Sequence, residues 1–180
     1  MNYHGQFGEP QYLDAYFNRK TNGVAVEVGA DDGVSGSNTC FFERYRNWNC
    51  LCIEPVPEKY NICKQSRKNA INCCAGKETT TAEFSIVTLG NNNTSAISSL
   101  AVDERLIDSH KHLIEKIEKI SVNVLKLTDI LDNCNFPRKI DFISIDTENT
   151  EIDVLHGFDL NKYDVKVLLI ENNFNESLHS

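Results

Sequence analysis

The 180-residue sequence lacks the features that mark several classes of protein. No apolar run approaches the ~20 residues that cross a membrane, and the polar N-terminus, Met1–Pro10, has no signal-peptide core. No basic stripe is present either, because Lys64–Lys68 is interrupted by Gln and Ser, and the net charge is −8. We therefore expect neither a membrane nor a nucleic acid as a partner.

The seven cysteines do not have the spacing of a metal site. Cys50 and Cys52 lie on an expected buried strand, and Cys73 and Cys74 are adjacent. Neither pair has the Cys-x-x-Cys spacing of a zinc site. We interpret the cysteines as reduced core thiols of a cytoplasmic protein. The length of the chain predicts a single domain over residues 1–180.

The most informative stretch is Val24–Gly33, where a short apolar run ends in a glycine turn. The β-branched residues of Val24–Val28 predict a buried parallel strand. The polar stretch Val34–Thr39 then leads into Cys40–Arg46, which we predict to be a helix. A strand, a glycine turn and a helix commonly open a nucleotide-binding pocket. A tight turn in any α/β domain would also fit this stretch.

The glycine spacing argues against a dinucleotide. The dinucleotide motif is G-x-G-x-x-G, but Asp31 takes the position of the middle glycine, and the glycines present are Gly29, Gly33 and Gly36. Asp31 and Asp32 would also repel a phosphate. S-adenosylmethionine carries an ammonium and a sulfonium and no phosphate. The acidic turn therefore indicates a methyltransferase.

Apolar segments alternate with helical patterns along the rest of the chain. This alternation predicts an α/β fold with a mostly parallel sheet and helices on both faces. The further strands of the sheet are expected at Asn49–Glu54, Ala70–Cys74, Ile140–Asp146 and Val165–Glu171, and the further helices at residues 11–19, 58–68, 129–133 and 151–156, with Thr128 as the cap of the third.

Three other segments have patterns of their own. Thr79–Val87 and Ser121–Lys126 alternate between apolar and polar residues, which predicts half-exposed strands. Leu100–Ile120 has apolar residues at helical spacing, and we predict a helix broken near Ser109. Between them, Gly90–Ser99 is rich in Asn, Ser and Thr and is expected to be a loop that covers a site.

Acidic residues lie at the ends of four of the five expected core strands. In parallel sheets, ligands bind at the carboxyl ends of the strands. Glu54 ends the second strand, where a carboxylate would accept hydrogen bonds from both ribose hydroxyls; a solvated strand-end acid is the alternative. The small residues after the third strand would leave room for an adenine. The remaining acids are Glu27, Asp31, Asp32, Asp146, Glu148 and Glu171.

Several short pieces of the sequence form a pattern through their order and spacing. They are Gln6-Phe7-Gly8-Glu9, residues 26–33, Gly36-Ser37-Asn38-Thr39, Ile53-Glu54-Pro55, Asn72–Ala75, Ser98-Ser99-Leu100, residues 140–146, and Glu148 with Glu151. Taken together, these pieces resemble the FkbM-type methyltransferases.

The resemblance implies a class I, Rossmann-like, S-adenosylmethionine-dependent fold. It also implies methyl transfer to oxygen, commonly to a hydroxyl of a sugar, so that the partner is a small-molecule or glycan acceptor. The cofactor contacts that we assign on this basis are Glu27, Gly29, Ala30, Asp31, Gly33, Asn38, Glu54, Pro55, Cys74, Ala75 and Asp146.

Two departures from the family pattern stand out. The family turn Asp-x-Glu-Gly is here Asp146-Thr147-Glu148-Asn149; Asn tolerates a left-handed backbone, but its side chain would crowd the pocket. The chain also ends soon after the fifth strand, whereas the class I fold usually adds two more. We expect the last strands to be absent, and covering the exposed sheet edge would favour a homodimer.

A sulfonium methyl group is already activated, so that the protein must mainly align the acceptor and remove a proton. We assign Asp146 to orienting the acceptor, and Glu148 or Glu171 to the general base, without a choice between them. As alternatives, Glu171 is a strand-end charge and Glu148 a helix N-terminal acid. The many carboxylates offer oxygen ligands for a magnesium ion, but no chelating spacing is present, and we assign no metal. The rival functions are a non-catalytic cofactor- or glycan-binding module and an NAD-dependent oxidoreductase, which Asp31 disfavours.

Overall fold

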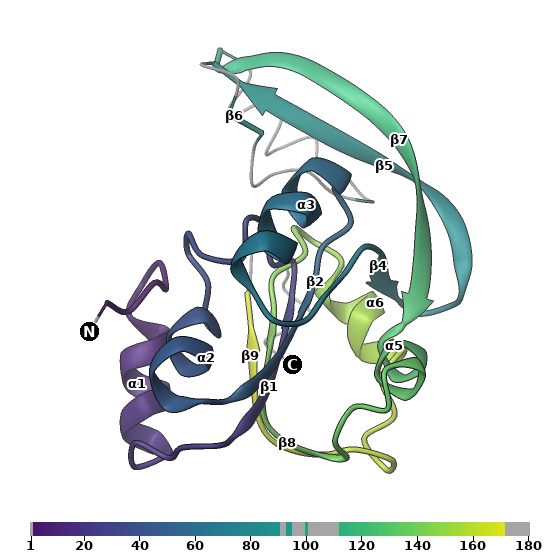
Figure 1. The fold of residues 1–180 in the computed structure, drawn as a ribbon. Helices are drawn as coiled ribbons and strands as arrows, with labels where there is room; N and C mark the ends of the chain where they lie inside the picture. Colours follow the sequence, from purple (N-terminus) through teal and green to yellow (C-terminus); the bar gives the residue numbers. More distant parts are fainter. Residues whose placement is uncertain (1, 91–92, 95–99, 101–111, 172–180) are drawn as a thin grey trace.

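The centre of the molecule is a parallel sheet with the strand order β3-β2-β1-β8-β9 (Figure 1). The structure is a computed structural model, which describes residues 2–90, 93–94, 100 and 112–171. All four neighbouring pairs in this sheet are parallel, which confirms the predicted α/β class. The strands are β1 (Val24–Val28), β2 (Asn49–Ile53), β3 (Ala70–Ile71), β8 (Lys139–Ile145) and β9 (Asp164–Ile170).

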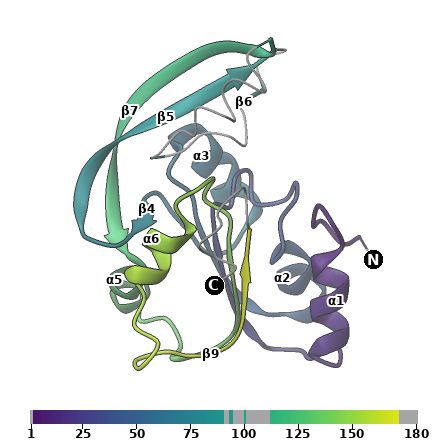
Figure 2. The ribbon, with the colours of Figure 1, turned by 180° about the vertical axis from the view of Figure 1, so that it is seen from behind.

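Helices cover both faces of this sheet, as predicted (Figure 2). Side chains alternate along β1, so that Ala25 faces one side and Val26 the other. The first side holds α1 (Glu9–Tyr16) and α2 (Cys40–Arg46) over an aromatic cluster that contains Phe41, Phe42, Trp48 and Phe142. The second side holds α5 (Leu127–Asn133) and α6 (Glu151–His156) over a larger aliphatic cluster.

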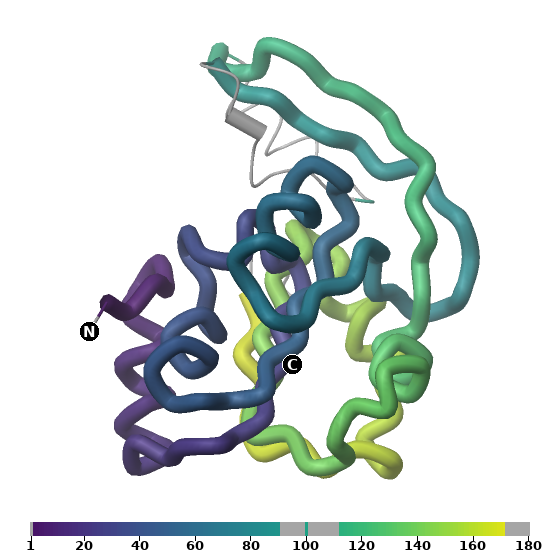
Figure 3. Tube along the Cα trace, viewed as in Figure 1, coloured from purple at the N-terminus to yellow at the C-terminus, as the bar shows by residue number. Residues whose placement is uncertain are grey.

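A second sheet, with the order β4-β7-β5-β6, stands beside the first. Its long strands pair antiparallel and form a curved ribbon that arches away from the body over α3 (Pro57–Ser66) (Figure 3). Val56 and Cys74 pack on the base of the ribbon, against Phe84 of β5 and two valines of β7. The strands are β4 (Cys74–Gly76), β5 (Thr80–Leu89), β6 (Asn93–Thr94) and β7 (Ile114–Lys126).

The helix predicted over Leu100–Ile120 is wrong for residues 114–120, which belong to β7. Ile114, Ile117 and Ile120 are spaced by three residues as in a helix, but isoleucine is β-branched and favours a strand. Pairing with β5 over Thr80–Leu89 decides the outcome, because its hydrogen bonds outweigh a weak local pattern. Residues 101–111, with Ser109, lie outside the described residues, as does most of the expected loop at 90–99.

Three smaller predictions also need correction. The strand predicted over Ala70–Cys74 is divided between β3 and β4, because the Asn72 side chain donates hydrogen bonds to the carbonyls of Glu54 and Pro55 and ends the pairing with β2. Thr128 does not cap α5, because the helix already begins at Leu127. The Thr128 hydroxyl instead accepts a hydrogen bond from the Asp159 amide.

The first helix ends at Tyr16 rather than at Arg19, because Asn18 and Arg19 both adopt a left-handed backbone. The remaining helices and strands of the main sheet begin and end within two residues of their predicted limits.

Strand β9 pairs with β8 on one side and has no second partner among the described strands. The homodimer predicted from such an edge stays a prediction. Among the described helices, none is both long and apolar enough to span a membrane.

Candidate functional site

A cleft opens at the carboxyl ends of β1, β2, β8 and β9. Backbone hydrogen bonds continue past the strand ends: the Glu54 amide donates to Ile71 O, and the Glu171 amide donates to Ile145 O. The strand-end residues are therefore held in register around one hollow. The predicted residues that line it are Glu27, Gly29, Ala30, Asp31, Asn38, Glu54, Pro55, Cys74, Ala75, Asp146, Glu148 and Glu171.

Gly33, a predicted cofactor contact, is not among the residues that line the cleft. A Cβ atom at Gly33 would lie 2.7 Å from Cys63 Sγ, and one at Gly29 would lie 1.7 Å from the carbonyl oxygen of Asp146. Both glycines also have positive φ angles. The space beside both glycines is therefore filled by other atoms of the protein.

Glu27 lies at the back of the cleft and is 5% exposed. Its carboxylate accepts hydrogen bonds from the hydroxyls of Ser37 and Thr39 and from the Asn38 amide, at 2.6–2.7 Å. Arg67 lies 3.4 Å from the same carboxylate. Both oxygens of Glu27 thus hold the segment that follows the glycine turn.

Glu54 is also buried, and its carboxylate is held by two backbone amides. The amides of Asp31 and Val56 each donate to it at 2.8 Å. Burial raises the pKa of Glu54 to about 7, against the opposing effect of these hydrogen bonds. The carboxylate that we predict to hold a ribose is therefore fixed in orientation and titrates near neutral pH.

Asp31 forms an ion pair with Lys59 at the mouth of the cleft. Lys59 Nζ lies 2.7 Å from Asp31 Oδ1, and the two side chains are 18% and 46% exposed. Asp31 takes the position of the middle glycine of the dinucleotide motif. Its φ of 48° is positive, and glycine adopts such angles readily. The sequence analysis did not identify Lys59, because nothing in its spacing marks it as the partner of Asp31.

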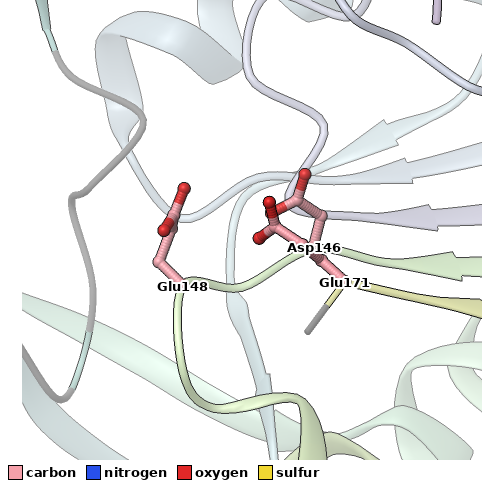
Figure 4. Close-up of side chains that lie close together, drawn as sticks. All are labelled: Asp146, Glu148 and Glu171. Carbon is pink, nitrogen blue, oxygen red and sulfur yellow. The ribbon is translucent and has the colours of Figure 1, made fainter. Parts of the chain in front are cut away.

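Three carboxylates meet at the other end of the cleft. Asp146 and Glu171 follow β8 and β9 directly, and one oxygen from each of Asp146, Glu148 and Glu171 lies within 4.8 Å of the others. Figure 4 shows the carboxyl groups of Asp146 and Glu171 next to each other, with that of Glu148 set off to one side. The structure thus brings together the three residues predicted to be catalytic.

The pKa of Asp146 is raised to about 9. Burial is the main cause, followed by the hydrogen bond with Glu171 and the negative charges of Glu171, Glu148 and Glu151. At neutral pH, Asp146 therefore keeps its proton and is the donor in its hydrogen bond with Glu171. Three oxygen ligands at this spacing also suit a divalent cation, a feature that the sequence spacing did not reveal.

The turn that departs from the family pattern keeps a left-handed backbone. Glu148 and Asn149 have φ angles of 54° and 82°. The Glu151 carboxylate accepts hydrogen bonds from the amides of Thr147 and Asn149, which holds the turn from inside. Asn149 is not among the residues that line the cleft, so that its side chain does not crowd it as expected.

The cleft has further walls that the sequence analysis missed. Phe84 reaches it from β5 in the second sheet, beside Val56 and Cys74. The alternation of Thr79–Val87 predicted the strand, but it did not indicate that the apolar face of the strand would line this cleft. The other missed lining residues are Gln6, Val28, Ser35, Gly36, Ser37, Ile53, Lys59, Cys73, Leu100, Ser144, Thr147 and Thr150.

Comparison with known families gives a match that covers most of the chain. The model described as the methyltransferase FkbM domain matches residues 27–180, which is all of the chain from Glu27 onwards. No curated protein and no solved structure matches the chain. The matched region contains every predicted site residue and all of the main sheet except the first three residues of β1.

Proposed function

Because the chain belongs to the family of methyltransferases with an FkbM domain, we propose that it transfers a methyl group from S-adenosyl-L-methionine to a hydroxyl oxygen of a sugar or glycan. The observation that carries the proposal is the meeting of strand-end carboxylates in one cleft. Their arrangement is asymmetric: Glu54 lies at one end, and Asp146 with Glu148 and Glu171 lies at the other. The family match supports the methyl transfer, and this asymmetry supports the choice of donor.

The residues of the cleft fit the three parts of the donor. Glu54, fixed by two amides, offers its remaining lone pairs to the ribose hydroxyls. Val56, Cys74, Ala75 and Phe84 provide an apolar wall for a flat adenine ring. The acidic cluster at Asp146 favours the positively charged methionine part. When bound, the donor supplies an activated methyl group.

The protein then has to orient the acceptor and remove its proton. One oxygen from each of Asp146, Glu148 and Glu171 lies within 4.8 Å of the other two, so that an acceptor hydroxyl beside the cluster can contact more than one of these acids. In this arrangement Asp146 orients the hydroxyl, and the carboxylate of Glu148 or Glu171 accepts its proton as the methyl group is transferred. Both candidates for the base are kept, because both contribute an oxygen to the cluster.

A methyl-transfer assay tests the function. The protein is incubated with S-adenosylmethionine labelled in the methyl group and with a panel of sugars and glycans, and label in the acceptor is measured. We expect transfer that depends on a hydroxyl-bearing acceptor and persists after chelation with EDTA, since no metal is assigned. Activity lost in EDTA and restored by Mg²⁺ would show instead that the carboxylate cluster holds a cation.

The same assay separates the rival function. Binding of S-adenosylhomocysteine without transfer to any acceptor would favour the non-catalytic module and contradict the proposal. The cytoplasmic location and the homodimer are further proposals; fractionation of cells and the molar mass in solution test them.

A further inference from the structure

Arg67 directly follows α3 and is buried completely: its side chain is 0% exposed. Its guanidinium donates hydrogen bonds to the carbonyl of Gly33 at 2.8 Å, to Ser37 Oγ at 3.2 Å and to Thr39 Oγ1 at 2.7 Å. Three points of the segment 33–39 are thus tied to one side chain from a different element. A planar guanidinium suits this task because its donors diverge in a fixed geometry.

Glu27 holds the same segment from the other side. Ser37 and Thr39 each donate a hydroxyl to it, and the Asn38 amide donates as well. Arg67 also lies 3.4 Å from the carboxylates of Glu27 and Glu43. The guanidinium therefore balances two buried negative charges while it holds the segment.

The segment between these anchors forms part of the cleft. Ser35, Gly36, Ser37 and Asn38 line it, whereas Arg67 does not. Gly33 and Gly36 have positive φ angles, and the segment contains no helix or strand. Its backbone conformation thus depends on side-chain anchors more than that of a strand would.

We propose that Arg67 is a positioning residue of the donor site: it fixes the segment 33–39 from behind, so that Asn38 and its neighbours meet the bound donor in one conformation. This inference rests on the proposed function. It assigns to Arg67 a role that neither its position in the sequence nor the lining of the cleft indicates.

The test compares two arginines that are both paired inside the protein. Arg46 donates two hydrogen bonds of 2.7 Å to Asp14, and the two side chains are 13% and 4% exposed. Neither residue lines the cleft. Arg46→Met therefore removes a buried ion pair without touching the segment, and it is the matched control for Arg67→Met.

Binding of S-adenosylhomocysteine is measured by calorimetry at a temperature well below both unfolding transitions. We expect Arg67→Met to weaken binding at least tenfold, and Arg46→Met to change it less than twofold although both lower the Tm. In the transfer assay, Arg67→Met should raise the KM for the donor while kcat at saturating donor stays within about threefold.

A double-mutant cycle tests whether Arg67 acts through the segment. Asn38→Ala should weaken binding in the wild-type background and have little further effect in Arg67→Met. Fully additive losses would overturn the inference, as would a folded Arg67→Met protein that binds within twofold of wild type.

If Arg67→Met does not fold, the binding of S-adenosylhomocysteine by Thr39→Val tests the inference instead. This substitution removes one hydroxyl that links Arg67 and Glu27 while keeping the shape of the side chain. We expect about a threefold loss of binding; unchanged binding would overturn the inference. Failure of the wild-type protein to bind S-adenosylhomocysteine would instead contradict the proposed function itself.

Discussion

The two ends of the cleft treat their carboxylates differently. At the β1–β2 end, each acid is balanced by a partner: Glu27 by Arg67, Asp31 by Lys59, and Glu54 by two backbone amides. At the β8–β9 end, Asp146, Glu148 and Glu171 crowd together, and burial, with the neighbouring acids as a further cause, keeps a proton on Asp146 at neutral pH.

This difference shows which end suits which chemistry. At the β1–β2 end, these partners hold the acids in one orientation. Recognition of the neutral hydroxyls of a ribose requires acceptors that are fixed in this way. Crowded acids at the β8–β9 end are destabilised by one another and gain most from a positive charge or from a proton to accept. Binding and reaction are therefore expected at opposite ends of one cleft, and substitutions at the two ends should have different effects.

The largest effect is expected at the β8–β9 end. Asp146→Asn keeps the size of the side chain but removes the carboxyl group that we assign to orienting the acceptor hydroxyl. We expect methyl transfer to fall by about 10²–10⁴-fold, the usual contribution of proton transfer and positioning, with donor binding less affected. Steady-state kinetics at saturating donor measure this.

The control for Asp146→Asn is Asp153→Asn on α6, a half-exposed acid outside the cleft. It should leave turnover unchanged. Full turnover in Asp146→Asn with donor bound would remove the distinction between the two ends.

At the β1–β2 end, Glu54→Gln should affect binding rather than turnover. Loss of a charged acceptor is worth roughly 1.5–3 kcal/mol, so that we expect about a 10- to 100-fold weaker affinity for S-adenosylhomocysteine. Calorimetry measures this affinity, and Glu83→Gln, a substitution of an exposed glutamate, is the control.

Wild-type affinity should also weaken as pH falls below 7, because Glu54 is then protonated, and Glu54→Gln should remove this dependence. A Glu54→Gln protein that binds like wild type but turns over slowly would reverse the roles of the two ends.

The stability of the protein should depend on pH through Asp146. Its pKa is about 9 in the folded protein and 3.8 ordinarily, so that between these values the folded chain holds a proton that the unfolded chain has released. Stability therefore falls as pH rises through this window. Between pH 7 and 9, the Tm should drop by roughly 5 °C.

Asp146→Asn should flatten this drop, because the amide does not titrate. Differential scanning fluorimetry of both proteins over this range measures the difference. Equal slopes for the two proteins would mean that the acids at the β8–β9 end do not share a proton.

The smallest effect is expected for Lys59→Gln, which removes the partner of a half-exposed acid. Such pairs contribute about 0–1 kcal/mol. The Tm should change little, and S-adenosylmethionine should gain affinity relative to the neutral S-adenosylhomocysteine by no more than about threefold. A loss of affinity for both ligands would show that Lys59 itself contacts the donor.

The fold was predictable where the local pattern and its end signals agree. Val24–Val28, Cys40–Arg46 and Glu151–His156 have the bounds that their sequences predicted. For residues 114–120 the local spacing predicted a helix, and the prediction failed because the strand in that position is determined by pairing with β5, a distant part of the chain. A single-sequence pattern carries little of that information.

The site shows the same limit. The acids were predictable, because parallel strands bring their carboxyl ends to one edge of the sheet. Their partners were not, since Lys59 and Arg67 both come from α3 or its end and have no distinctive spacing to Asp31 or Glu27. The raised pKa of Asp146 likewise depends on Glu171 from a neighbouring strand.

Calorimetric titration of the wild-type protein with S-adenosylmethionine, S-adenosylhomocysteine and NAD is the most direct test of the donor assignment. Glu54 at one end and the acids around Asp146 at the other predict that both sulfur compounds bind, with one molecule per chain, and that NAD does not. Binding of NAD in preference to either, or no binding of any of the three, would contradict it.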